Sequence, residues 1–370
     1  MKDAFVQLAE RLEGMGNSFA CTPEAIAYLK KIFTEEQARI FVVMEDRFQP
    51  VEEVAERLGL SPEALKPKLD EMADKGLVMT TTKIEPTFYA PLPWLTGWGD
   101  WIAYYEDKET AEAHFKFGGS FIQNISQVTA TNWKRNAFRT VPIYETIPNE
   151  NTIAPYDNIR KVMENAETIS VANCYCDLHR KLVGESIIEP LERCFLFGVY
   201  AEYLIEKGFG RKVSAEEAIK ILDKCRDAGL THNVTDLKNP IFLCNCPSYC
   251  GANILRGKFP LDLFPVNAEV QVNNYCAVVD ADLCTGCQDC VGRCNLDAIS
   301  MSDEGIAQIE DARCVGCGQC VYHCPVEALK LKERPEHYTP ITVHPNDRSS
   351  EEYKADLERY KDIIKPRKGE

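Results

Sequence analysis

Two copies of one cysteine pattern lie close together near the C-terminal end of the sequence. The first copy reads Cys284-Thr-Gly-Cys287-Gln-Asp-Cys290-Val-Gly-Arg-Cys294. The second copy begins thirty residues later and reads Cys314-Val-Gly-Cys317-Gly-Gln-Cys320-Val-Tyr-His-Cys324-Pro325. Both have the spacing C-x2-C-x2-C-x3-C, and each is followed by an acidic residue, Asp297 or Glu327, and a short apolar step. Such an internal repeat predicts two equivalent halves of one small domain.

Cysteines at this spacing are typical ligands of [4Fe–4S] clusters. The first three can wrap one cluster in a tight loop that glycine permits, and the fourth begins a short helix that crosses to the other half. Two zinc sites are the competing interpretation, but zinc modules usually pair two C-x2-C units across a longer gap. The pattern therefore predicts two [4Fe–4S] clusters within residues 276–332.

This stretch closely resembles the bacterial two-cluster ferredoxins. By that resemblance, the last cysteine of each copy ligates the cluster of the other copy. The first cluster would be held by Cys284, Cys287, Cys290 and Cys324. The second cluster would be held by Cys314, Cys317, Cys320 and Cys294. Asn295 stands where the family usually has proline, and we expect it to loosen the local turn without affecting ligation.

Clusters with four thiolate ligands have no open coordination site, so one-electron transfer is the expected chemistry. Residues 276–332 contain nine acidic side chains and four basic ones. This acidic balance favours docking to a basic surface on a redox protein or a catalytic oxidoreductase subunit. The whole chain carries a net charge of -15, which points away from nucleic acid and anionic membranes.

Nine of the 17 cysteines lie outside the repeat. Short predicted strands at 169–171 and 241–243 lead into two C-x-C pairs, and a C-x-C pair places both sulfurs on one side of the chain. Six cysteines form a candidate third iron–sulfur site, with four expected to ligate: Cys174, Cys176, Cys194, Cys244, Cys246 and Cys250. A zinc site and structural or redox-active thiols are the alternatives.

The remaining cysteines and one histidine are weaker candidates. Cys225 lies on the apolar stripe of a predicted helix and is expected in the core. No role is expected for Cys21, and Cys276 at the entry to the repeat is left undecided. His179 is an outside candidate ligand, although a solvent-facing or hydrogen-bonded histidine is the more ordinary interpretation.

Residues 1–80 are expected to form a helical, winged-helix-like domain. Two predicted helices between Val51 and Met79 are separated by Gly59 and Ser61-Pro62, as in a helix-turn-helix. Residues 51–80 hold seven acidic and four basic side chains, which opposes phosphate binding, and Pro67 falls inside the second helix. We therefore expect a scaffold or protein-docking role, with DNA binding as the alternative.

The other segments complete an α+β architecture. Residues 81–150 form an aromatic-rich connection in which Trp98, Trp101 and Tyr105 share one helical face, either in a core or interdomain seam or facing a partner. Residues 151–275 are expected to be a mixed α/β domain. Residues 333–370 are expected to be a polar tail with a helix. The N-terminal sequence lacks the apolar core of a signal peptide, and no apolar run approaches 18 residues, so the cytoplasm is the expected location.

The order of these segments resembles a broad group of iron–sulfur proteins from anaerobic bacteria and archaea that carry ferredoxin domains. The resemblance implies an electron-transfer subunit of, or a dedicated donor to, an anaerobic oxidoreductase. In that group the Cys-Asn-Cys segment often carries additional adjacent cysteines. This chain has Pro247 and Ser248 there instead. The alternatives are an iron–sulfur enzyme with a site-differentiated cluster in the middle domain and a redox-sensing winged-helix regulator.

Overall fold

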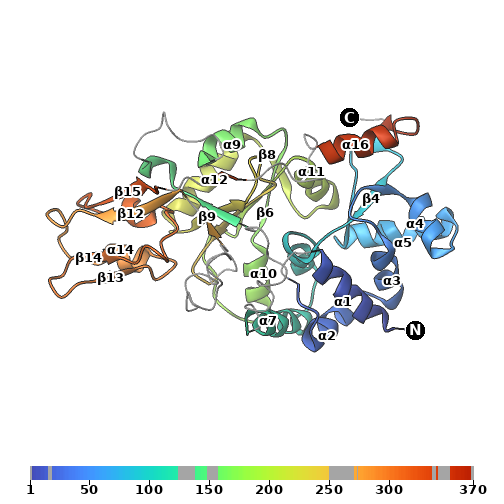
Figure 1. Cartoon of the computed structure of the whole chain (residues 1–370), viewed down its shortest axis with the longest axis horizontal. Coiled ribbons are helices and arrows are strands. Elements are labelled where there is room, and N and C mark those ends of the chain that lie inside the picture. The colour runs from blue at the N-terminus through green and yellow to red at the C-terminus, as the bar shows by residue number, and fades with distance from the viewer. Residues whose placement is uncertain are drawn as a thin grey trace.

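The computed structural model describes residues 2–15, 19–123, 138–147, 157–249, 271–272, 274–335, 339–340 and 351–367. Three parts follow one another along the long axis of the molecule (Figure 1). Helices of the N-terminal part lie at one end, a sheet flanked by helices lies in the middle, and the cysteine repeat projects at the other end. The C-terminal helix returns to the N-terminal part (Figure 1).

The N-terminal part begins with five helices whose ends are set by local sequence. They are α1 (Ala4–Gly14), α2 (Pro23–Ile32), α3 (Glu35–Val43), α4 (Val51–Leu58) and α5 (Pro62–Asp74). The Thr34 hydroxyl accepts a hydrogen bond from the Gln37 backbone N–H, and the Gln37 side chain accepts one from Thr34 N–H, so α3 begins with a capping box. Gly59 ends α4 in the left-handed conformation, with φ of +66°.

The N-terminal part also has a small antiparallel sheet with the strand order β1-β4-β2, and β1 lies between α3 and α4 in the chain. Its strands are β1 (Gln49–Pro50), β2 (Val78–Thr80) and β4 (Phe88–Pro91), and β3 (Ile84–Glu85) lies between the last two in sequence. This element order is compatible with a winged helix, which stays a prediction. The domain boundary expected at residue 80 falls inside the sheet, because β4 supplies its central strand.

The basic side chains of α5 are engaged with acidic neighbours. Lys66 pairs with Asp70 and Lys68 pairs with Glu36. These partners reduce the positive potential that the helix could offer to phosphate groups, and the scaffold role stays a prediction.

The aromatic segment packs in the core, as the first of its two interpretations predicted. It comprises a π-helical turn η1 (Trp94–Trp98), α6 (Gly99–Trp101) and the 3-10 turn η2 (Ile102–Tyr104), before α7 (Lys108–Gln123). Trp98 and Trp101 are 0% and 2% exposed, so neither is open to a partner, whereas Tyr105 is 45% exposed. The Trp101 ring stacks on Phe209 of the middle part, with ring centroids 6.3 Å apart, so the segment forms a seam between the two parts.

The middle part is a seven-stranded sheet in the order β11-β5-β9-β10-β7-β6-β8. Its strands are β5 (Phe138–Val141), β6 (Ile169–Asn173), β7 (Glu192–Phe197), β8 (Arg211–Val213), β9 (Thr231–Thr235), β10 (Phe242–Cys246) and β11 (Gln271–Val272). All neighbours are antiparallel except β11 and β5. Because β5 is part of this sheet, the middle domain begins before the expected boundary at residue 151.

Helices cover the sheet on both faces. They are α9 (Ile159–Asn165), α10 (Tyr175–Leu182), α11 (Gly198–Lys207) and α12 (Ala215–Asp227), with the 3-10 turn η3 (Tyr144–Thr146) near the repeat. One face packs Val171, Phe195 and Val234 against α9 and α12. The other face joins the N-terminal helices in one continuous core, and Cys174, Cys194, Cys244 and Cys246 lie in that core.

The cysteine repeat folds into two short hairpin-like sheets and two short helices. Its elements are β12 (Tyr275–Val279), α14 (Asp289–Arg293), β13 (Ile299–Met301), β14 (Ala307–Ile309), α15 (Gln319–Tyr322) and β15 (Leu329–Glu333). Strand β12 pairs with β15, and β13 pairs with β14. We refer to residues 275–333 as the module.

The C-terminal tail packs on the N-terminal part. Helix α16 (Glu351–Arg359) is followed by β16 (Lys365–Pro366), which pairs with β3. The Tyr360 hydroxyl donates a hydrogen bond to Glu53, and its ring lies 5.0 Å from that of Phe88. Among the described helices, none has the length and apolar character needed to cross a membrane.

Candidate functional site

The two cysteine loops of the module have matching backbone conformations. The residue before the second cysteine of each copy, Gly286 or Gly316, has a positive φ of 71° or 61°. A Cβ atom at Gly316 would lie 2.4 Å from the Tyr275 carbonyl oxygen, so only glycine fits there. The residue after the second cysteine also has a positive φ, 67° at Gln288 and 83° at Gly318. These turns curl each loop back on itself, as a loop around a cluster requires.

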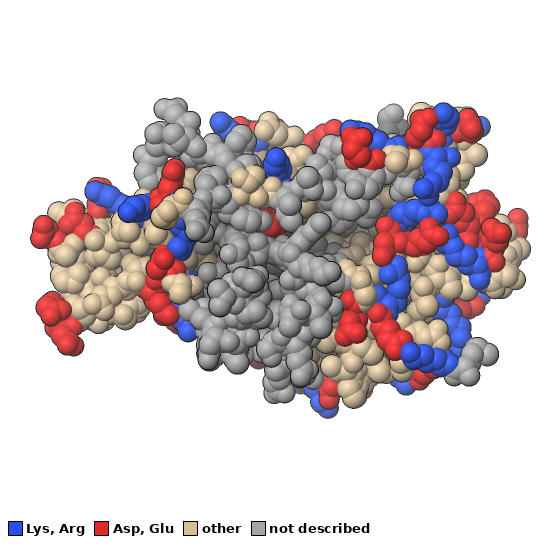
Figure 2. All heavy atoms as spheres, in the orientation of Figure 1, with Lys and Arg blue, Asp and Glu red and all other residues tan. Residues whose placement is uncertain are grey.

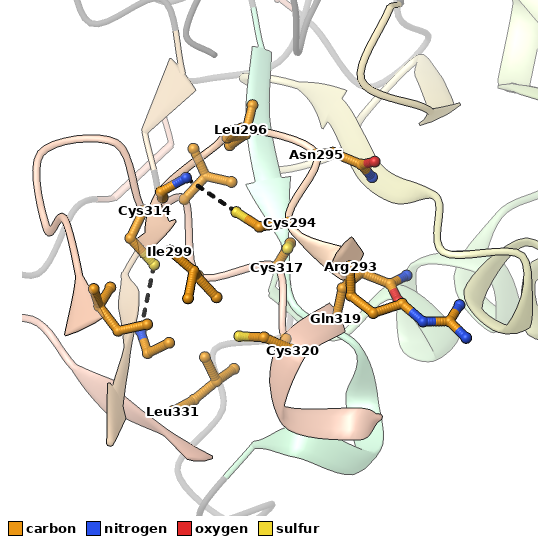
Figure 3. A pocket seen from close by; sticks show the side chains of 16 residues that line it. Arg293, Cys294, Asn295, Leu296, Ile299, Cys314, Cys317, Gln319, Cys320 and Leu331 are labelled. Atoms are coloured by element: carbon orange, nitrogen blue, oxygen red, sulfur yellow. Dashed lines mark hydrogen bonds between the residues drawn. The ribbon is translucent and has the colours of Figure 1, made fainter. Parts of the chain in front are cut away.

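One cavity of the module is bordered by Cys314, Cys317 and Cys320 of the second copy and by Cys294 of the first. Their sulfur atoms point toward a common space (Figure 3). The apolar side chains of Ile299 and Leu331 form part of the wall. The structure thus brings together the four residues predicted to hold the second cluster.

The other cavity has the complementary set. We number each cavity by the copy that supplies three of its cysteines, so the cavity just described is the second cavity and this one is the first cavity. It is bordered by Cys284, Cys287 and Cys290 of the first copy and by Cys324 of the second. The fourth cysteine of each copy therefore lies at the cavity of the other copy. This placement agrees with the crosswise assignment, while ligation itself stays a prediction.

Backbone N–H groups are directed at several sulfur atoms. Ala277 N–H donates to Cys314 Sγ at 3.4 Å, and Ala298 N–H donates to Cys294 Sγ at 3.3 Å. Such donors stabilise negative charge on sulfur. Burial raises the pKa of Cys317 to about 12 and raises that of Cys320 well above its usual value, so a bound metal would have to displace these protons. Thiol donors, aimed N–H groups and an apolar wall fit a [4Fe–4S] cluster in each cavity.

The two cavities differ in their exposure. In the first copy, Cys287, Gln288 and Asp289 are exposed, whereas Gly318 and Gln319 at the matching positions of the second copy are buried. The middle part covers the second copy. Ile143 N–H donates to the Cys317 carbonyl at 3.0 Å, and Gln319 Nε2 donates to the Leu230 carbonyl at 2.8 Å. The second cavity therefore lies against the body of the protein.

Asn295 is one of the residues that fix the module to the body. Its side-chain amide donates to the Gly229 carbonyl at 2.7 Å and to the Thr231 hydroxyl at 3.1 Å. The Thr231 hydroxyl in turn hydrogen-bonds Cys317. Figure 3 shows Asn295 directed away from the cavity, toward the neighbouring part of the chain. The sequence predicted only that Asn295 would loosen the turn. Proline, the usual residue of the family at this position, has no side-chain amide and could not make these two hydrogen bonds.

Gly318 should be intolerant of any side chain. Its φ is +83°, and a Cβ atom there would lie 2.3 Å from Thr146 Oγ1. We expect Gly318→Ala to lower the free energy of unfolding by about 1–3 kcal/mol from backbone strain, with the collision adding to that. Gln288→Ala is the matched control, because that position already holds a side chain at positive φ. Equal urea midpoints for the two variants would contradict this account of the interface.

Five of the six middle-domain candidates lie in described elements, and Cys250 lies outside the described residues. Cys174 is the N-cap of α10 and Cys176 lies in its first turn. Cys194 lies in β7, and Cys244 and Cys246 lie in β10. The second C-x-C pair is therefore within a strand, not in the loop after it, and the alternation of a strand places both sulfurs on one face.

Four of these cysteines form a contiguous set of thiols, which we call the middle tetrad: Cys174, Cys194, Cys244 and Cys246. All four are buried, with exposures from 0% to 4%. Cys246 Sγ donates to Cys244 Sγ at 3.0 Å, and Cys194 hydrogen-bonds both Cys174 and Cys244. The hydrogen bond with Cys174, together with burial, raises the pKa of Cys194 well above the usual value, and the bonds with Cys194 and Cys246, together with burial, do the same for Cys244. Cys176 is half-buried.

A buried cation lies beside the middle tetrad. Arg193 donates to Cys174 Sγ at 3.4 Å and pairs with Asp177 Oδ2 at 2.6 Å, and both charged side chains are 0% exposed. Asp100 is also close to α10, and burial raises its pKa well above the usual value, which favours its neutral form. Around the tetrad, Arg193 therefore supplies positive charge that could offset thiolate.

The weaker candidates occupy ordinary positions. Cys225 is fully buried in the core between α12 and the sheet, as predicted. Cys21 and Cys276 are half-buried. His179 pairs through Nε2 with Glu106 Oε1 at 2.7 Å, and the two side chains are 2% and 1% exposed. His179 is therefore a buried histidine beside a carboxylate and is not solvent-facing.

The Glu106–His179 pair predicts a pH-dependent stability. Burial, with repulsion from Asp107, raises the pKa of Glu106 from 4.5 to about 8, and burial lowers that of His179 from 6.5 to about 4. Between pH 6.5 and 8, folded Glu106 keeps a proton that the unfolded chain has lost, so the free energy of unfolding should fall as the pH rises. Between about pH 4.5 and 6.5 the two groups act in opposite directions, because His179 binds its proton only in the unfolded chain.

Urea unfolding of Glu106→Gln at pH 6.5 and 8 tests this prediction. In this variant the free energy of unfolding should fall much less between pH 6.5 and pH 8 than in the wild type. Asp107→Asn, which removes an exposed neighbouring carboxylate, should keep most of this decline, because burial is the larger cause of the raised pKa of Glu106. The prediction is wrong if Glu106→Gln keeps the full decline.

Within the described ranges, no group of three or more cysteine, histidine or acidic side chains is already arranged to hold a single metal ion. This statement covers the eight cysteines of the module as well as the middle tetrad. Neither set is thus a preformed site for one ion such as zinc.

Comparison with known proteins identifies the module. Residues 277–331 match the 4Fe-4S dicluster domain. A probable ferredoxin from Methanosarcina thermophila is 50% identical over 36 residues, which make up 10% of this chain and 62% of that protein. The chain thus spans less than two thirds of this curated relative. No solved structure matches. The dicluster domain is therefore a ferredoxin-type [4Fe–4S] domain, and its type indicates iron–sulfur electron transfer.

Several functional residues could not be found from the cysteine pattern. Thr231, Asn295 and Gln319 link the dicluster domain to the body, and Arg193 lies at the middle tetrad. Only Asn295 carried a signal in the sequence, as a departure from the family pattern. The others are ordinary residue types whose importance depends on tertiary contacts.

Proposed function

We propose that this protein is an electron-transfer subunit of, or a dedicated electron donor to, an oxidoreductase. The observation that carries the proposal is the presence of two cavities, each bordered by three cysteines of one copy and one cysteine of the other. When bound, two [4Fe–4S] clusters would each supply one-electron redox chemistry. The chain supplies all eight thiolates, directs backbone N–H groups at sulfur and encloses each site with apolar side chains.

The exposed cavity is the proposed point of contact with a redox partner. Cys287 is exposed there, and Leu283 and Val326 beside it are 46% and 37% exposed. Exposed acidic side chains surround this end: Asp280, Asp282, Asp289, Asp303, Glu304 and Glu327. Figure 2 shows acidic groups at the far end of the domain. A partner with a basic rim around an apolar centre would fit this surface, and its association rate would fall as salt increases.

The relay would extend into the protein if the middle cysteines hold a third centre. The second cavity is packed against the middle part through Ile143, Thr231 and Leu230. Electrons received at the exposed cavity would therefore reach a site in contact with the body. This arrangement favours a fixed relay over a freely diffusing carrier.

Low-temperature EPR of anaerobically purified protein tests the proposed function. Reduction should produce signals from two interacting [4Fe–4S] clusters, and chemical analysis of the dicluster domain should account for about eight irons. A basic redox partner should then be reduced more slowly at high salt than at low salt. A protein without reducible clusters would end the proposal.

A further inference from the structure

The middle tetrad has features that separate it from a set of core cysteines. Its four thiols come from three places in the chain, the N-cap of α10 and strands β7 and β10. Cys225, by comparison, is buried on the other face of the sheet among Leu222, Phe195 and Leu230. Convergence of thiols from separate elements is the arrangement that a shared metal centre needs.

Two groups beside Cys174 interact favourably with negative charge on its sulfur atom. The N-terminus of the eight-residue helix α10 lies at Cys174, and the helix dipole places partial positive charge at this end. Arg193 is fully buried and donates to Cys174 Sγ. A helix N-terminus and a guanidinium hydrogen bond therefore meet at one sulfur atom, and Asp177 balances the charge of that guanidinium.

A short path joins the tetrad to the dicluster domain. Thr231 hydrogen-bonds Cys317 at the second cavity, and Thr231 lies directly opposite Cys246 in the pairing of β9 with β10. Residues opposite each other in an antiparallel pair point to the same face, with Cβ atoms about 5 Å apart. One hydrogen bond and one cross-strand pair thus separate a cluster ligand from a tetrad sulfur.

We propose that Cys174, Cys194, Cys244 and Cys246 hold a third, iron–sulfur centre that exchanges electrons with the cluster of the second cavity. The inference rests on the proposed electron-transfer function and names its inner redox site. Such a centre would gain one electron as the nearer cluster loses one, with no bond made or broken and no proton transferred. Binding would require the four thiols to lose their protons and separate from their mutual hydrogen bonds.

The first experiment counts iron, acid-labile sulfide and zinc in the full chain purified without oxygen. A [4Fe–4S] centre predicts about twelve irons and about twelve sulfides, and a smaller cluster predicts intermediate values above eight. Cys194→Ser should return both counts to about eight, and Cys225→Ser should leave them unchanged. Cys174→Ala provides a second ligand variant at a helix terminus, in case the strand variant does not fold.

Other outcomes overturn the inference. Eight irons in the wild-type protein, or one bound zinc with no iron above eight, would exclude an iron–sulfur centre at the tetrad. Fewer than eight irons in both the wild type and Cys225→Ser would instead count against the dicluster function, so the two failures are distinguishable.

EPR of the reduced protein tests the electron exchange. Close approach predicts magnetic broadening of the second-cavity cluster in the wild type and in Cys225→Ser. The broadening should disappear in Cys194→Ser. A third centre that leaves the cluster spectrum unbroadened would contradict the short path through Thr231.

Discussion

Replacing Cys294 and Cys317 together by alanine is expected to remove one cluster, not two. These residues belong to different copies of the repeat but border the same cavity. Either single change should therefore lower the iron of the dicluster domain from about eight to about four, and the double change should lower it no further. All three variants keep the four cysteines of the other cavity.

The matched double variant gives the opposite result. Cys294 and Cys287 belong to one copy but border different cavities. Cys294→Ala with Cys287→Ala should remove both clusters and leave almost no iron in the domain. If each copy held its own cluster with its own four cysteines, the two double variants would exchange their outcomes. Iron and sulfide analysis, with EPR of the remaining cluster, measures the difference.

Asp157→Ala is expected to lower the free energy of unfolding by about 3–5 kcal/mol, because it leaves a buried guanidinium without its carboxylate. Arg139 Nη1 lies 2.7 Å from Asp157 Oδ1, and the two side chains are 2% and 5% exposed. The other Asp157 oxygen accepts from Asn274 at 2.8 Å, at the entry to the dicluster domain. The change thus affects both the sheet and the attachment of the domain.

A double variant separates charge burial from loss of volume. Arg139→Met with Asp157→Leu replaces the pair by apolar side chains, and buried pairs replaced in this way are often close to neutral in stability. Urea unfolding should place the double variant nearer to the wild type than Asp157→Ala. Wild-type stability in Asp157→Ala would contradict the importance of the pair.

The sequence predicted the parts of the site that depend on local spacing. The repeat of four cysteines identified the dicluster domain, because the loop around a cluster is short and uses a fixed ligand interval. Of the two C-x-C pairs, Cys244 and Cys246 lie together with Cys174 in the middle tetrad, whereas Cys176 lies outside it, and ligation by any of them stays a prediction. Trp98 and Trp101 were predicted in a core or seam, and both are buried there.

Tertiary contacts explain what the sequence could not predict. Strand β4 follows the expected domain boundary, yet it joins β1 and β2, because sheet pairing depends on register and not on position in the chain. Asn295 was expected only to loosen a turn, and its two acceptors belong to residues more than sixty positions earlier. Cys176 and Cys194 could not be ranked from spacing, whereas burial and thiol contacts place Cys194 within the tetrad.

The different exposure of the two cavities has a consequence for voltammetry. In sequence the copies are close equivalents, but one cavity lies at an exposed end and the other is covered by the body. Solvent and hydrogen bonds to sulfur tune the potential of a cluster, so equal ligands in unequal surroundings should give unequal potentials. Voltammetry should then show two separate one-electron waves in place of one overlapping wave. The difference between the two potentials would set a preferred direction for electrons along the molecule.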